Sequence, residues 1–155
     1  MKKLIALLAL ALFPLSAFAQ IELTTEIFKV VTVKDKNGNS KVEWQKPDNI
    51  VPGDKVGYRI RFANTGNEAA DDLVLNNPIP ENTVYVSDSA RGANSQILFS
   101  VDGGKEFKNA DQLFVTKNGK KLKATAKDYT NVRWVISNAL KAGENDSVQY
   151  IVQVK

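Results

Sequence analysis

Apolar and polar residues alternate along much of the chain, which is the pattern of a β-strand that buries one face and exposes the other. The clearest alternation covers residues 55–62, 131–137 and 148–154, and a shorter run covers 97–101. Residues 27–33 are rich in β-branched side chains, but the pattern does not decide which face they bury. We therefore predict a chain built mainly from short strands.

Turn-forming residues separate these runs at short intervals. Asn-Gly pairs at 37–38 and 118–119 are typical of two-residue hairpin turns. Asp-Gly-Gly at 102–104 is expected to close a third hairpin, between residues 97–101 and 106–107. The spacing of the turns favours antiparallel pairing of neighbouring runs.

No segment keeps a helical period, and only residues 125–129 suit one short helical turn. Pro78 and Pro80 lack N–H donors, so their stretch is expected at a sheet edge or where the chain crosses between sheets. About eight short strands with Gly-rich turns predict an all-β fold, an antiparallel β-sandwich, with a closed barrel as the alternative. One domain is expected over residues 20–155.

The first 19 residues have the pattern of a cleaved secretory signal peptide. Lys2 and Lys3 precede an apolar segment, and Ala-Phe-Ala at 17–19 is typical of a cleavage site. The apolar segment is shorter than the roughly 20 residues that a membrane span needs, so we expect no transmembrane anchor. These features predict an exported bacterial protein, in the periplasm or outside the cell.

The composition excludes several kinds of catalytic site. The chain of 155 residues has no His and no Cys. It therefore cannot form a Ser-His-Asp triad, a Cys nucleophile or a metal site of imidazole or thiolate ligands. A glycosidase would need two carboxyl groups roughly 5–10 Å apart in a cleft, and no acidic pair in the sequence stands out for that role. We therefore expect that the protein is not an enzyme and that it binds neither a cofactor nor a metal ion.

The charge is modest. Lys and Arg number 21, Asp and Glu number 17, and the formal net charge is +4. Loss of Lys2 and Lys3 with the signal peptide would halve the net charge. The remaining charge is too small for the basic surface of a nucleic-acid-binding protein. The expected partner is an envelope protein or a cell-wall polymer, and edge strands would also permit self-association.

Three stretches carry a distinctive order of residues. They are Val-Pro-Gly-Asp-Lys-Val-Gly-Tyr-Arg-Ile at 51–60 with Asn-Thr-Gly at 64–66, Asn-Pro-Ile-Pro-Glu-Asn-Thr at 77–83, and the closing segment 134–154. Together they resemble a bacterial surface-protein repeat family, the domain of unknown function eleven, although Asn76 and Asn77 stand where that family commonly has an acid. The resemblance covers residues 50–154. It implies an Ig-like β-sandwich in an exported protein with no established enzymatic activity.

Two groups of residues are candidates for binding. Trp44 lies near an expected sheet edge, where an exposed ring would serve as a stacking platform for a sugar, whereas Trp134 is expected in the core. The second group is a lysine cluster around the 118–119 turn, which would attract anionic polymers or lipid headgroups, or simply protect a sheet edge. The cluster consists of Lys117, Lys120, Lys121, Lys123 and Lys127.

Three further motifs favour structural roles. Residues 35–39 superficially resemble a calcium loop, but the Gly and Glu spacing of an EF-hand is missing, so a polar turn is expected. Asp71 and Asp72 would point to opposite faces of a strand start and would not converge. Tyr129 is a candidate for a hydroxyl anchored to nearby backbone, as in the tyrosine corner of Ig folds.

These features predict a non-catalytic envelope or surface protein, a protein-interaction or structural module. It would bind through a sheet face or an open edge strand. The alternative is a module that binds carbohydrate or cell-wall polymer through Trp44 and the lysine cluster.

Overall fold

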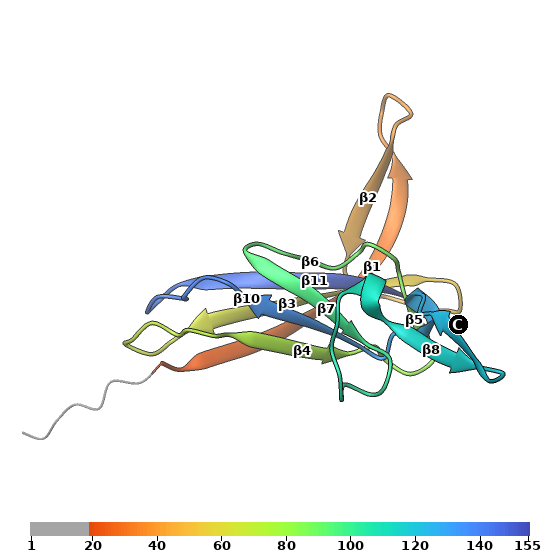
Figure 1. Ribbon diagram of the computed structural model, residues 1–155. Coiled ribbons are helices and arrows are strands. Elements are labelled where there is room, and N and C mark those ends of the chain that lie inside the picture. Colours follow the sequence, from red (N-terminus) through yellow and green to blue (C-terminus); the bar gives the residue numbers. More distant parts are fainter. Residues whose placement is uncertain (1–18) are drawn as a thin grey trace, which may run out of the picture.

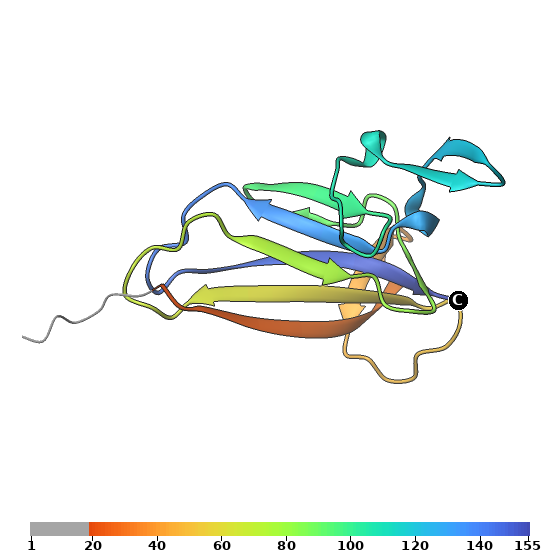
Figure 2. The ribbon, with the colours of Figure 1, turned by 60° about the horizontal axis from the view of Figure 1, so that its bottom comes forward.

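Two antiparallel sheets face each other as a β-sandwich in the computed structural model, which describes residues 19–155 (Figures 1 and 2). Apart from Ala19, the signal peptide predicted for residues 1–19 lies outside the described residues. In chain order the strands are β1 (Ile21–Lys34), β2 (Ser40–Gln45), β3 (Lys55–Asn64), β4 (Val74–Pro78), β5 (Thr83–Tyr85), β6 (Arg91–Gly92), β7 (Ser95–Ser100), β8 (Phe114–Lys117), β9 (Lys120–Lys123), β10 (Asn131–Ile136) and β11 (Asn145–Val154). Two short 3-10 helices are η1 (Ala110–Gln112) and η2 (Ala126–Asp128).

The larger sheet has the order β2-β1-β3-β11-β5, with β6 also paired to β11, and the smaller sheet has the order β4-β10-β7. β8 and β9 pair only with each other and form a separate hairpin. The prolines mark an edge and a crossing, as predicted. Pro78 ends the edge strand β4, and after Pro80 the chain enters the larger sheet at β5. The all-β sandwich is confirmed.

Inward side chains of β3, β10 and β11 fill the space between the sheets. Phe62 is 1% exposed, and Trp134 and Tyr150 are not exposed at all. Tyr58 stacks on Tyr150 with ring centroids 5.1 Å apart. Full burial of an apolar side chain of this size stabilises the fold by about 1.5–3 kcal/mol. The alternation in residues 55–62, 131–137 and 148–154 thus identified the core strands correctly.

Turn chemistry also follows the sequence. Asn118 and Gly119 have φ angles of 52° and 73°, the left-handed conformation that a two-residue hairpin turn needs, and they join β8 to β9. The single helical turn expected at residues 125–129 is η2. The Asn37-Gly38 pair lies in the turn between β1 and β2.

The hairpin expected across residues 102–104 is wrong in part. β7 and the returning chain share only one bridge, between Phe99 and Lys108, and residues 106–107 form no strand. The reason is local. The carboxylate of Asp102 accepts hydrogen bonds from the backbone N–H groups of Lys105 and Glu106, at 3.1 Å each, so side-chain bonds take the place of a ladder.

Two other expectations are corrected. Residues 19–155 contain eleven strands rather than about eight, because strands as short as β6, which has two residues, show no alternation in the sequence. The first strand begins at Ile21, not at residue 27, and is 14 residues long. Its first half was missed because Thr25 takes an inward position where an apolar residue would have continued the pattern.

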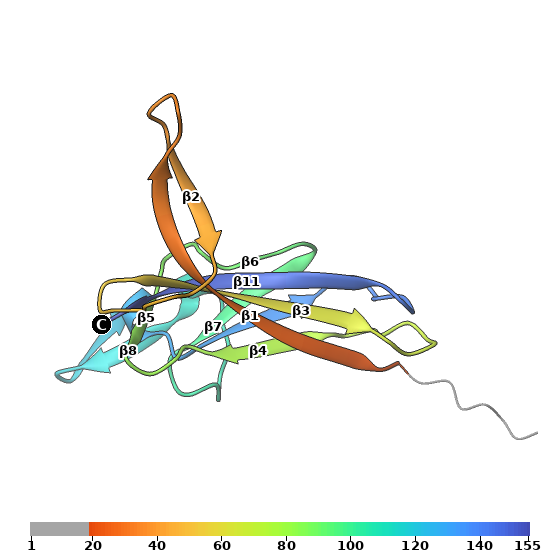
Figure 3. The same cartoon turned by 180° about the vertical axis from the view of Figure 1, so that it is seen from behind.

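β1 pairs with two different strands along its length. Residues 21–30 pair with β3, and residues 29–34 pair with β2. The paired ends of β1 and β2 project from the sandwich as an arm, which we define as residues 31–44 (Figures 1 and 3).

Candidate functional site

One long side of the sandwich is open, between β1 and β4. Among residues 19–155, residues 21–28 of β1 pair with β3 on one side only, so they form a free edge of the larger sheet. Within the same residues β4 pairs only with β10 and forms a free edge of the smaller sheet. A cleft of about 130 Å³ separates the two edges, with Ile60 and Trp134 among its lining residues. We call this region the open side.

The inward face of β1 is apolar and uncovered at the open side. Leu23 pairs in register with Phe62, and Ile27 pairs with Tyr58, so both share the inward face of β3. Leu23 is nevertheless 56% exposed and Ile27 is 47% exposed. The smaller sheet ends at β4 and does not extend over them. The sandwich therefore lacks one strand of cover on this side.

The backbone at the edge of β4 also faces the open side. Leu73 and Ile79, just outside the two ends of β4, bond through their backbone to the chain of β10, at 2.9 and 2.8 Å. Hydrogen bonding alternates along an antiparallel pair, so the N–H groups of Val74 and Asn76 point away from β10. Pro78 has no N–H group and ends the edge. The backbone N–H groups of Val74 and Asn76 are thus free to bond to a partner, close to the exposed side chains of Leu23 and Ile27.

The edge of β1 is longer. Thr65 N–H donates to the carbonyl of Gln20 at 2.8 Å, which sets the alternation of this pair. The backbone groups of Leu23, Thr25 and Ile27 therefore point away from β3. No proline interrupts this edge.

Hydrogen bonds hold the end of β4 in place. The side-chain Nδ2 of Asn77 donates to the hydroxyl of Tyr150 at 2.6 Å, and that hydroxyl donates to the backbone carbonyl of Pro78 at 3.2 Å. Burial raises the pKa of the Tyr150 hydroxyl well above its ordinary value.

On the outer face of the small sheet, Arg133 fixes the side chain of Asn76. Its Nε donates to the side-chain oxygen of Asn76 at 2.6 Å, and its guanidinium lies 3.6 Å from the ring centroid of Phe107. This hydrogen bond fixes the amide side chain of Asn76 against Arg133.

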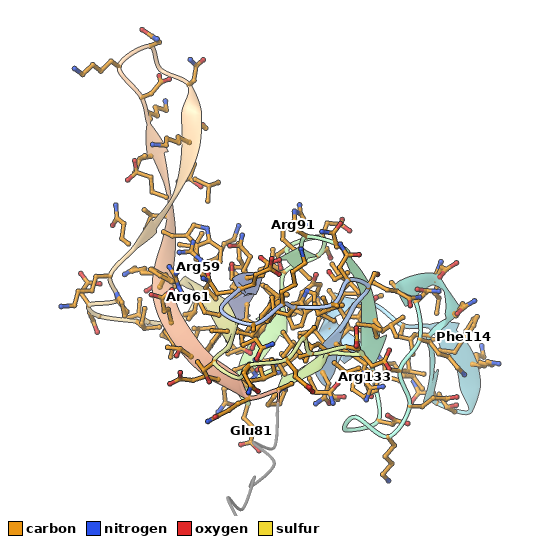
Figure 4. The ribbon with its side chains drawn as sticks, turned by 90° about the vertical axis from the view of Figure 1, so that its left-hand side faces the viewer. Arg59, Arg61, Glu81, Arg91, Phe114 and Arg133 are labelled. Carbon is orange, nitrogen blue, oxygen red and sulfur yellow. The ribbon has the colours of Figure 1, made fainter. Side chains whose placement is uncertain are left out.

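Trp44 lies on the outer face of the larger sheet, at the root of the arm. Its ring covers Gly57, where a Cβ atom would come within 2.5 Å of the indole. Phe28 meets the ring edge-on, with centroids 5.5 Å apart. Arg59 is labelled in Figure 4 near the base of the arm. Its guanidinium lies 5.4 Å from the centroid of the Trp44 ring. One face of the ring is occupied by the sheet, so Trp44 is half-buried, whereas Trp134 lies in the core as expected.

The lysine cluster lies on and beside the β8–β9 hairpin. Lys117 pairs with the carboxylate of Asp128. This hydrogen bond, with one from the backbone of Thr125, holds the pKa of Asp128 below its ordinary value. The structure adds Phe114 to this cluster, a residue that the sequence analysis did not single out. The ammonium group of Lys121 lies 4.6 Å from the centroid of the Phe114 ring.

The remaining motifs have local roles. The carboxylate of Asp35 accepts hydrogen bonds from the backbone of Asn37 and Asn39, so residues 35–39 form the expected polar turn. Asp71 and Asp72 were expected at a strand start, and this expectation is wrong. They lie exposed in the loop before β4, where Asp72 has a φ of 53°. This positive φ breaks the extended backbone that a strand start would need.

The backbone anchor predicted for Tyr129 is also wrong. Its hydroxyl bonds to no residue within 19–155, and its ring stacks on Phe99 at 4.5 Å. Tyr85 makes such an anchor instead, because its hydroxyl accepts a hydrogen bond from the backbone N–H of Ala90 at 3.0 Å. The rings of Tyr85 and Tyr129 pack together with centroids 5.8 Å apart, so the sequence pointed to the right aromatic cluster but to the wrong hydroxyl.

No group of three acidic side chains within residues 19–155 could hold a metal ion. No helix in the same range is long and apolar enough to cross a membrane.

Sequence reasoning missed the residues of the open side. Leu23 and Ile27 lie on one strand face, but Thr25 between them interrupts its apolar pattern. Their exposure depends on the width of the opposite sheet, and nothing in the local sequence records it.

No protein-family model, curated protein or solved structure matches this chain. The resemblance of residues 50–154 to the surface-protein repeat family therefore stays a prediction.

Proposed function

We propose that this chain is a non-catalytic, exported envelope protein that binds another protein by strand addition at its open side. An extended segment of the partner pairs with the free edge of β4 and covers the inward face of β1. The observation that carries this proposal is the exposure of Leu23 and Ile27 on a face that is otherwise core.

The chemistry of the open side specifies the partner segment. Val74 and Asn76 supply N–H donors, so the segment must be extended and offer backbone carbonyls at matching spacing. Its side chains that face Leu23 and Ile27 must be apolar. The segment would thus alternate apolar and polar residues, with the apolar ones completing the core.

The test compares two matched lysine substitutions in the full chain, expressed in its native cells. Leu23 is 56% exposed at the open side, and Val42 is 57% exposed on the arm. We expect Leu23→Lys to abolish recovery of a cross-linked partner, because the new charge would be buried in the joint core. We expect Val42→Lys to leave recovery unchanged.

Amide hydrogen exchange supplies the second readout. Binding of the recovered partner should slow exchange at Val74 and Asn76, since their N–H groups become bonded. Equal recovery with both lysine variants, or unchanged exchange at these two amides, would contradict strand addition. A stable homodimer with the same protection would show that a second copy, not another protein, is the occupant.

A carbohydrate-binding module is the second candidate, supported by the surface cluster of Phe28, Trp44 and Arg59. A sugar stacked on the free face of Trp44 would change the fluorescence of the indole. Titration with cell-wall glycan fragments should then shift the emission of the chain but not that of Trp44→Phe. No shift with any fragment would remove this candidate.

A further inference from the structure

A second surface lies at the other end of the sandwich from the start of β1, on the β8–β9 hairpin (Figure 1). The hairpin pairs with neither sheet and projects beside the smaller one (Figure 2). It is attached at its base by Leu113 and Ala124, which are 3% and 6% exposed. Most of its surface is therefore available to a partner.

The pairing of β8 with β9 gathers an aromatic ring and two lysines on one face. Phe114 lies opposite Lys123, and Thr116 lies opposite Lys121. Side chains of directly paired residues share a face, so these four residues line one face of the hairpin, which we call the Phe114 face. Phe114 is 46% exposed there, and the ammonium of Lys121 lies 4.6 Å from its ring centroid.

The cations of this face are unpaired, and the acids near them are already bonded. Within residues 19–155, Lys117 is the one member of the lysine cluster within ion-pair distance of a carboxylate. Glu106, which lines a cleft with Phe114 and Lys121, lies 2.9 Å from Lys108. The Phe114 face therefore presents positive charge without a counter-ion from the chain.

An exposed aromatic ring among lysines fits the boundary between phospholipid headgroups and acyl chains. The ring enters the apolar layer, while the lysine stems lie along it and their ammonium groups reach the phosphates. Anionic headgroups attract each nearby lysine, whereas a soluble polyanion would make no use of Phe114. We propose that the Phe114 face of the β8–β9 hairpin docks this protein reversibly on membranes that contain anionic phospholipid.

The test is co-sedimentation with vesicles of phosphatidylglycerol and phosphatidylcholine in equal parts, compared with phosphatidylcholine alone. We expect binding to the mixed vesicles only, weakened by added salt because the Debye length shortens. Lys121→Gln with Lys123→Gln should weaken binding about fivefold for each lysine. Phe114→Ser should weaken it about tenfold, through loss of the buried ring.

The matched control lies on the same hairpin. Leu122 is 47% exposed, almost the same as Phe114, but pairs with Val115 and so lies on the opposite face. Leu122→Ser should leave vesicle binding unchanged. Equal losses from Leu122→Ser and Phe114→Ser would contradict docking through one face.

Three results would overturn the proposal. They are no binding to the mixed vesicles, equal binding to phosphatidylcholine alone, and binding to soluble polyphosphate that Phe114→Ser leaves unchanged. The proposal stands apart from strand addition at the open side. Leu23→Lys, which should lose the protein partner, should keep vesicle binding.

Discussion

Two hairpins leave the sandwich, and they are held in different ways. The arm shares β1 with the larger sheet, so its root continues a ladder of backbone hydrogen bonds. The β8–β9 hairpin shares no strand with either sheet and depends on side chains at its base. A hairpin that continues a strand of a sheet is held by the hydrogen bonds of that sheet, whereas a hairpin outside the sheets must be held by packing at its base.

The largest expected effect tests the packed anchor. Leu113→Ala should destabilise the protein by about 2–5 kcal/mol, because it leaves a cavity at the base of the β8–β9 hairpin. The measurement is the free energy of unfolding in urea, followed by tryptophan fluorescence.

Leu122→Ala is the control on the same hairpin, and at 47% exposure it should change stability by no more than about 0.5 kcal/mol. Similar costs for the two substitutions would mean that the hairpin is not anchored at its base.

The next effect tests the root of the arm. Gly57→Ala should cost about 1–3 kcal/mol, because the new methyl group overlaps the ring of Trp44 and forces it from the sheet. Hydrogen exchange of residues 31–34 should accelerate as the arm loosens, while that of β8 and β9 should not change.

A double-mutant cycle isolates the cause. In a Trp44→Ala background the same Gly57→Ala substitution should cost nothing, because the overlapping ring is gone. An equal cost in both backgrounds would assign the effect to the strand backbone instead of Trp44.

The smallest effect concerns the ionic contact beside the β8–β9 hairpin. Asp128 accepts from Lys117 and from both the backbone and the hydroxyl of Thr125, and its pKa is lowered. Asp128→Ala should cost about 1 kcal/mol at pH 6, mostly through loss of the capping bonds at η2.

The sign of the pH dependence follows from the lowered pKa. A carboxyl with a depressed folded-state pKa contributes fully above its unfolded value, about 3.9, and loses that contribution as pH falls through the folded value. The stability difference between the wild type and Asp128→Ala should therefore shrink below about pH 4. A difference that grows in acid would contradict this assignment.

The core strands could be predicted because their alternation is regular. Val132, Trp134 and Ile136 are buried, as their spacing indicates. The same rule failed for the first half of β1, where Thr25 interrupts the apolar face. It also failed across residues 102–106, where side-chain bonds to Asp102 replace a ladder.

The candidate surfaces were predictable only in part. The lysine cluster is visible as composition, but its association with Phe114 depends on the register of β8 and β9. Trp44 was identified from its position near an edge, yet its partner Gly57 lies on β3, which does not pair with β2. A contact between strands that do not pair leaves no local pattern in the sequence.

The sequence by itself determined the all-β class, the main core strands, the Asn-Gly hairpin turns and the edge role of Pro78. These depend on side-chain periodicity, backbone conformation and missing donors, which are properties of neighbouring residues. Only the tertiary structure decided that β1 extends beyond the cover of the smaller sheet and that Leu23 and Ile27 are exposed. Exposure is set by the relative widths of two packed sheets, and that quantity depends on how the whole chain pairs.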